Sequence, residues 1–172
     1  MYQPAGTYYF ELLFIPNTGQ AAPTFSEATF DAWTDSTLSG TNAGNGIPTG
    51  LFLGHIMGEN NAIGIAVSGW ASSTSAYFVV LGWSADEGTW PNVEDALNGG
   101  SWLSPTGLFG YSMVGDALAG ARPAPATILF GSYTGVIDTG WDLNPVPEPS
   151  TLALAGLGGL SLLLMRRLKH KD

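Results

Sequence analysis

The feature that most limits how this chain can fold is an uncharged apolar run near its C-terminus, Leu152 to Met165, which ends in basic residues. The run holds 14 residues rich in Leu, Ala and Gly. As an α-helix it would measure about 21 Å at about 1.5 Å per residue. A bilayer span usually needs roughly 20 residues, but Ser150 and Thr151 can add a turn, and long basic side chains can reach the interface. A helix that is apolar on every face predicts a membrane segment.

The basic residues that follow this run predict its orientation. Four of the five Lys and Arg residues of the chain are gathered here, at Arg166, Arg167, Lys169 and Lys171. Basic residues stay on the cytoplasmic side, so residues 1–149 are expected outside. The predicted membrane anchor consists of seven leucines: Leu152, Leu154, Leu157, Leu160, Leu162, Leu163 and Leu164. The alternative, a buried core helix, is disfavoured because core helices of soluble domains are amphipathic.

A short Pro-rich segment precedes the run, with the sequence Val146-Pro147-Glu148-Pro149. This segment, the apolar helix and the basic end occur in the order of the PEP-CTERM sorting tail of exported bacterial proteins, which residues 146–171 resemble. The resemblance implies that an exosortase, a membrane-embedded cysteine transpeptidase, recognises Pro-Glu-Pro and that the tail is removed there, much as a GPI signal is removed. It also implies a transient stay in the inner membrane, followed by the cell envelope or an extracellular matrix, often in bacteria that make exopolysaccharide. Leu168, His170 and Asp172 dilute the basic end relative to the family pattern.

The start of the chain does not match an exported protein. A signal peptide has a basic n-region, an apolar core of about 7–15 residues and a cleavage site with small residues. Residues 1–6 have none of these, and Glu11 interrupts the apolar stretch at residues 7–15. We therefore expect Met1 to be an internal start with a signal peptide encoded upstream, which the upstream reading frame would test.

The composition of residues 1–145 limits the functions open to the body of the protein. This part carries 12 acidic residues and a single basic one, Arg122, for a net charge of about −11. It has no basic patch that could neutralise phosphates, which excludes nucleic-acid binding. The chain contains no Cys, so disulfides, thiol nucleophiles and thiolate metal sites are excluded. The length suits one domain with its own core.

Hydrophobic alternation with a period of two dominates the body and predicts strands. At residues 7–15, Tyr8, Phe10, Leu12 and Phe14 share one face. Residues 77–83 are almost continuously apolar, as expected of a central strand that is covered on both faces. Clusters of Gly, Pro, Asn and Ser separate the other predicted strands, which are residues 29–34, 51–56, 62–68, 108–113 and 127–130.

One segment has helical rather than strand character. Residues 90–98 contain an early Pro91, apolar Val93 and Leu97 four positions apart, and Gly99 as a stop signal, which predicts a short helix. The predicted fold is therefore all-β, an antiparallel jelly-roll-like β-sandwich with one short inserted helix, plus a single C-terminal transmembrane helix. The predicted divisions are an extracytoplasmic domain at 1–144, a linker with the Pro-Glu-Pro signal at 145–150, and the membrane helix with its cytoplasmic end at 151–172.

Side chains that could support catalysis are few. Outside the C-terminal end the chain has one His, His55, which a Ser-His-Asp site would need as its base; no Gly-x-Ser-x-Gly elbow occurs. A glycosidase needs only two carboxylates about 5–10 Å apart. Three acidic pairs could supply them, and solvated surface acids are the simpler explanation of all three: Asp86 with Glu87, Glu94 with Asp95, and Asp31 with Asp35.

A cofactor is not expected, with Ca²⁺ as the one candidate. Asp138 and Asp142 flank a Gly-containing turn and could offer the oxygen ligands that Ca²⁺ prefers. No EF-hand or repeat-type calcium motif accompanies them, so a specific calcium site is the weaker interpretation.

The six Trp residues are the remaining functional signal. Trp83 lies inside the apolar strand and is expected in the core. Trp90, Trp102 and Trp141 stand beside Pro or Gly in predicted loops and are the candidates for stacking on sugar rings, although burial in the core is the simpler explanation for the set. The overall hypothesis is a non-enzymatic surface or matrix protein that associates with exopolysaccharide or with copies of itself. The alternative is a secreted carbohydrate-active enzyme that uses a carboxylate pair.

Overall fold

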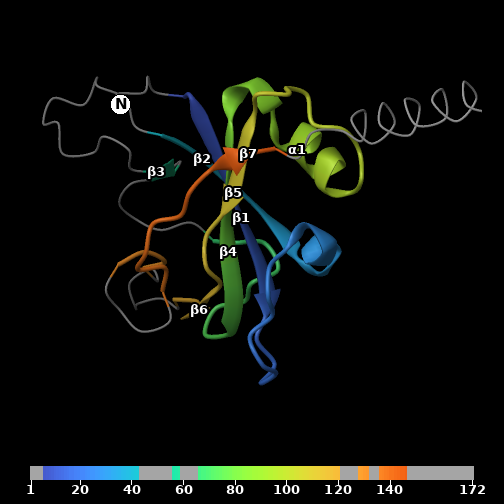
Figure 1. The fold of residues 1–172 in the computed structure, drawn as a ribbon. Coiled ribbons are helices and arrows are strands. Elements are labelled where there is room, and N and C mark those ends of the chain that lie inside the picture. The colour runs from blue at the N-terminus through green and yellow to red at the C-terminus, as the bar shows by residue number, and fades with distance from the viewer. Residues whose placement is uncertain (1–5, 43–55, 59–65, 121–127, 132–135, 147–172) are drawn as a thin grey trace, which may run out of the picture.

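The computed structural model describes residues 6–42, 56–58, 66–120, 128–131 and 136–146 (Figure 1). This part of the chain is mostly antiparallel β-sheet with one α-helix, which confirms the predicted β-rich class. Within it, no helix has both the length and the apolar character to cross a membrane. The predicted membrane leucines, the basic cluster, residues 147–149 of the sorting signal and His55 all lie outside the described residues.

Two long strands form the centre of the sheet. β1 (Tyr8–Pro16) pairs with β4 (Ser75–Ser84) in antiparallel register, from Tyr8 opposite Ser84 to Pro16 opposite Ala76. After Ser75 every residue of β4 is buried. The prediction of a central strand covered on both faces is therefore confirmed, and its continuous apolar sequence is explained by the absence of a solvent face.

The remaining strands extend the sheet on both sides of this pair. β2 (Thr34–Asn42) pairs with β1, and β3 (Ile56–Gly58) pairs with β2. On the other side, β5 (Leu108–Tyr111) and β6 (Gly115–Leu118) follow one another along β4. β7 (Asn144–Pro145) pairs with β5, so the order is β3-β2-β1-β4-β5-β7 with β6 beside β4.

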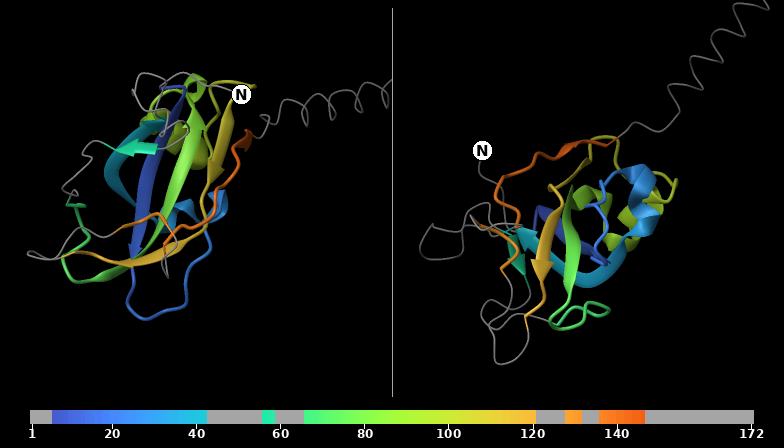
Figure 2. Two further views of the ribbon diagram at one scale, coloured as in Figure 1. Left: turned by 90° about the vertical axis from the view of Figure 1, so that its left-hand side faces the viewer. Right: turned by 90° about the horizontal axis from the view of Figure 1, so that it is seen from below.

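The prediction of two packed sheets is corrected, because all described strands belong to one sheet. Each face of this sheet is covered by helices or loops. One face packs its apolar side chains against two helical segments, the 3-10 helix η1 (Glu27–Ala32) and the α-helix α1 (Trp90–Leu97). Both lie on the same side of the sheet in Figure 2. The opposite face is covered by loop residues, namely Val67, Trp70, Leu129, Ile137 and Trp141. The strand pattern predicts alternating burial but not whether a second sheet or loops provide it.

The segment predicted as a strand at residues 29–34 is instead mostly helical. It lies in the 3-10 helix η1 (Glu27–Ala32), in which Phe30 is buried, and β2 begins only at Thr34. β2 escaped prediction because its sequence is polar. Its pairing with β1 contains a bulge between Glu11 and Leu13.

The predicted helix at 90–98 is confirmed as α1 (Trp90–Leu97). It follows the short 3-10 helix η2 (Ala85–Glu87). The Asn92 side chain accepts the Thr89 backbone N–H at 3.1 Å and so caps the first turn. Val93 and Leu97 bury the inner face of α1 against the sheet.

Other strand predictions have mixed outcomes. The strand at 108–113 is confirmed as β5, ending at Tyr111. Most of the predicted strands 51–56 and 62–68 lies outside the described residues, although Ile56 begins β3. Of residues 127–130, Phe130 forms a single parallel bridge to Ile137.

Candidate functional site

The most informative local feature is the end of the folded body, directly before the Pro-Glu-Pro signal. Val146 is 4 % exposed and belongs to the hydrophobic cluster between the sheet and α1. Its backbone N–H donates to the carbonyl oxygen of Gly107 at 3.0 Å. The predicted linker at 145–150 therefore begins with two residues, Pro145 and Val146, that the sheet holds.

Pro145 occupies a position in β7 that suits its missing N–H. Antiparallel pairs alternate between hydrogen-bonded and non-hydrogen-bonded positions. The bond from Val146 to Gly107 makes that pair hydrogen-bonded, so the next pair, Pro145 with Leu108, is non-hydrogen-bonded. Pro at such a position on an edge strand costs no ladder bond.

A buried carboxylate organises the loop that contacts Val146. Glu87 is 1 % exposed, and its Oε2 accepts the Leu103 N–H at 2.8 Å. The Ser104 N–H lies at 3.3 and 3.4 Å from the two carboxylate oxygens. Gly107 packs so tightly on this carboxylate that a Cβ there would overlap it. Glu87 thus fixes the loop whose Gly107 carbonyl binds Val146.

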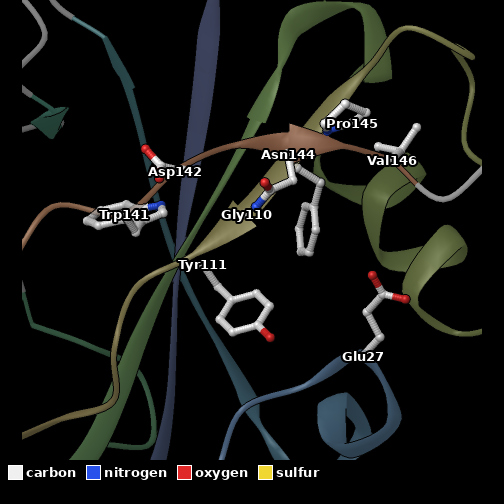
Figure 3. A pocket seen from close by; sticks show the side chains of 9 residues that line it. Glu27, Gly110, Tyr111, Trp141, Asp142, Asn144, Pro145 and Val146 are labelled. Carbon is white, nitrogen blue, oxygen red and sulfur yellow. The ribbon is translucent and has the colours of Figure 1, made fainter.

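A groove of about 420 Å³ lies beside this junction. It is lined by residues of β5 and η1 and by the segment leading into Val146, which are Glu27, Phe109, Gly110, Tyr111, Trp141, Asp142, Asn144, Pro145 and Val146. Figure 3 shows Tyr111 and Glu27 below the strand that carries Asn144 and Pro145. The groove therefore combines an exposed aromatic ring with a carboxylate and an amide.

Tyr111 is a groove residue that the sequence analysis missed, together with Glu27 and Asn144. It is 40 % exposed, and its ring centroid lies 4.7 Å from that of Phe25, which packs against it in a tilted arrangement. The neighbouring Gly110 allows the backbone at Asp142 to lie close to β5, because a Cβ at position 110 would collide with the backbone oxygen of Asp142. The strand prediction included Tyr111, but nothing in the local sequence indicated that its side chain would stay exposed.

The three Trp residues predicted as sugar platforms lie on two faces of the sheet: Trp90 and Trp102 pack on the face that carries α1, and Trp141 packs on the opposite face. The Trp90 indole N–H donates to Asp35 Oδ2 at 3.0 Å, and its ring packs on Trp83 and Phe30 at 5.8 and 6.0 Å. Trp102 packs on Phe109 at 5.0 Å. Trp141 lines the groove and meets Phe10 edge-on at 6.4 Å. Of the three, Trp141 is the one at the groove, and Trp83 is buried as expected.

The carboxylates of Asp86 and Glu87 have different environments. Glu87 points into its loop, whereas Asp86 is exposed. The neighbouring Ser84 hydroxyl, with a smaller contribution from Ser104, holds the pKa of the Asp86 carboxyl below its usual value against an opposing effect of partial burial. Asp35 is occupied by Trp90 and by the Thr37 N–H at 2.7 Å.

The predicted calcium ligands lie at the surface. Asp138 and Asp142 are both exposed. Within the described part of the chain, no group of three or more His, Asp or Glu side chains is arranged to hold a metal ion. Asp142 also lines the groove.

Comparison with known families assigns the C-terminal part of the chain: the PEP-CTERM protein-sorting motif matches residues 145–167. The motif implies an exported protein that is targeted to an exosortase and processed in the cell envelope. No curated protein and no solved structure matches the chain.

Proposed function

We propose that the chain is a surface protein whose body associates non-catalytically with surface polysaccharide through the groove beside β5 and β7. After export, the tail would hold the protein in the inner membrane, and processing would release it to the envelope or an extracellular matrix. The observation that carries the proposal is the groove itself. Its volume of about 420 Å³ falls within the range of ligand sites, about 300–1,000 Å³.

The chemistry of the groove suits a sugar ring. The apolar C–H face of a sugar can stack on an aromatic ring, and Tyr111 offers one that is open to solvent and supported by Phe25. Glu27 and Asn144 supply an acceptor and an amide for the hydroxyl groups at the rim. An open site of this kind favours weak binding that becomes effective when many copies meet one polymer.

A non-catalytic role is favoured by how the acidic side chains are used. Glu27 and Asp142 both line the groove, but Figure 3 has them at opposite ends, with the Asp142 carboxylate directed away from Tyr111. Asp86 carries a lowered pKa, so it stays ionised at neutral pH and is unsuited to be a general acid. The secreted carbohydrate-active enzyme is therefore the less favoured alternative.

A glycan array probed with the purified full chain in detergent micelles tests the proposal. Glu27→Gln and Tyr111→Ala are expected to weaken binding at least several-fold, whereas Met113→Ala, at an exposed residue outside the groove, is expected to leave it unchanged. Near-UV circular dichroism would confirm that Tyr111→Ala keeps the fold. Absence of binding to every glycan, or equal binding by Glu27→Gln and Met113→Ala, would contradict the proposal. Release of new reducing ends from a bound glycan would favour the enzyme instead.

The acidity of the body gives a second test of the same proposal. At a net charge of about −11 in residues 1–145, the body should be repelled by anionic polysaccharides. Added NaCl or Ca²⁺ screens this repulsion, so retention on an acidic polymer is expected to rise with salt. Retention that falls with salt would indicate attraction between charges and would contradict the groove mechanism.

A further inference from the structure

The sorting signal is joined to a buried residue without a spacer. Pro147 is bonded directly to Val146, whose side chain lies in the core and whose N–H is bound to Gly107. We propose that Asn144, Pro145 and Val146 form a latch that holds the start of the signal against β5, and that the exosortase processes the signal only when this latch is released. The proposal rests on the matched sorting motif and does not require glycan binding, although the three latch residues also line the groove.

The physical basis is competition for the same backbone groups. Enzymes and receptors that take up an extended peptide bind its backbone N–H and C=O groups and the side chains on either side. In the closed latch, the Val146 N–H is committed to Gly107 and the Val146 side chain to the core. A transpeptidase that needs the residue next to Pro-Glu-Pro can engage it only in the released state. The observed rate then scales with the released fraction.

The latch is built to open without unfolding the domain. β7 has two residues, both exposed, and it pairs with β5 at the edge of the sheet. Such short edge elements open locally at much lower free energy than the core. The closed latch is therefore reversible, and the folded body sets the rate at which the tail is processed.

A disulfide staple tests this directly. Leu108 and Pro145 face each other as a non-hydrogen-bonded pair, for which the Cα atoms are about 4.5 Å apart, within the usual disulfide range of about 4.4–6.8 Å. The chain has no Cys of its own, so Leu108→Cys combined with Pro145→Cys can form one bridge. The full-length double variant would be reconstituted with exosortase-containing membranes, and processing would be followed by intact mass.

The oxidised double variant is expected to be processed at least about tenfold more slowly than the same protein reduced beforehand and freed of reductant. Each single Cys variant serves as a control for effects on recognition and is expected to behave like the reduced form. Equal rates for the oxidised and reduced forms would refute the latch. Faster processing of the oxidised form would also refute it, because docking would then present the signal rather than withhold it.

A second pair of variants, at residues outside the matched motif, tests whether loosening the latch makes processing faster. In Gly110→Ala, the new Cβ would collide with the Asp142 carbonyl oxygen, so the strand leading to the latch must move away and processing should be several-fold faster. Gly140→Ala is the matched control, because a Cβ there meets nothing within 4 Å. Circular dichroism would show that both variants are folded. A folded Gly110→Ala that is processed no faster than Gly140→Ala would show that the latch does not limit the reaction.

Discussion

Replacing Glu87 by Gln is expected to lower the free energy of unfolding by about 2 kcal/mol, and Glu87→Ala by about 4 kcal/mol. The carboxylate is buried and accepts the backbone N–H groups of Leu103 and Ser104. A net hydrogen bond to a charged group contributes about 1.5–3 kcal/mol. The 2.8 Å bond from Leu103 should reach that range, whereas the longer contacts from Ser104 should contribute at the lower end.

The two substitutions differ for a structural reason. Gln keeps the shape and one acceptor oxygen, but its NH₂ group faces an N–H donor, so one bond is lost. Ala loses both bonds and leaves a void where Gly107 packs on the carboxylate. Asp86→Asn is the matched control, since it makes the same charge change at the exposed neighbouring residue and should cost less than about 0.5 kcal/mol.

Thermal unfolding of the full chain in mild detergent, followed by near-UV circular dichroism of the Trp residues, would measure these effects. At about 2–4 °C per kcal/mol for a domain of this size, the Tm should fall by about 4–8 °C in Glu87→Gln and by about twice as much in Glu87→Ala. If Glu87→Gln unfolds within 1 °C of Asp86→Asn, the carboxylate does not support the loop as described, and the reasoning fails.

Three further predictions concern the core, the pH dependence and the tail. Trp83→Ala should lower the free energy of unfolding by about 3–5 kcal/mol because the indole is buried. In a parallel urea titration, Trp141→Ala should lower it by less than half as much, because Trp141 is partly exposed; equal losses would place Trp141 in the core. The pKa of Asp86 in the folded state lies below its unfolded value of 3.8, so the ionised carboxylate stabilises the fold above about pH 4, and this stabilisation is lost as the pH falls. Asp86→Asn should therefore lower the free energy of unfolding at pH 7 by a few tenths of a kcal/mol, a small effect because solvent screens the exposed group. In an acid titration the variant and the natural chain should become equally stable near pH 2. Glu148→Gln, or deletion of residues 166–171, should leave the protein unprocessed or mistargeted, because the first change alters the matched signal and the second removes the basic residues that set the orientation of the tail. Intact-mass analysis of the natural surface form is the check, and a form that still ends at Asp172 would argue against removal of the tail.

Local sequence was sufficient where a segment's structure depends on its own residues. The strand β1, the apolar run of β4 and the Pro91, Val93 and Leu97 pattern of α1 are predicted and confirmed. The polar side that the alternation assigned to β1 is corrected, because both faces of β1 are covered and Glu11 is itself buried. Each pattern states which faces must leave water, and the period of that pattern separates a strand from a helix. β2 failed this test because it is polar, and it becomes a strand by pairing with β1.

The groove and the latch depended instead on contacts between distant segments. Tyr111 stays exposed while its ring contacts Phe25 from a distant part of the chain, and Val146 is buried because β7 returns to β5. No local pattern distinguishes an exposed Tyr in a strand from a buried one. Residues 37 positions apart, such as Leu108 and Pro145, are brought together only by the folded sheet.

The sequence alone determined that the chain carries a sorting tail, because Pro-Glu-Pro, an apolar run and a basic end are consecutive in the chain and are matched as a linear motif. It also determined the β-rich class of the body through hydrophobic alternation. Only the tertiary structure decided that one sheet is covered by helices and loops rather than by a second sheet, and that the residue before the signal is held in the core. The physical reason is that linear motifs and periodicity are properties of neighbouring residues, whereas burial and edge pairing are set by which distant segments meet.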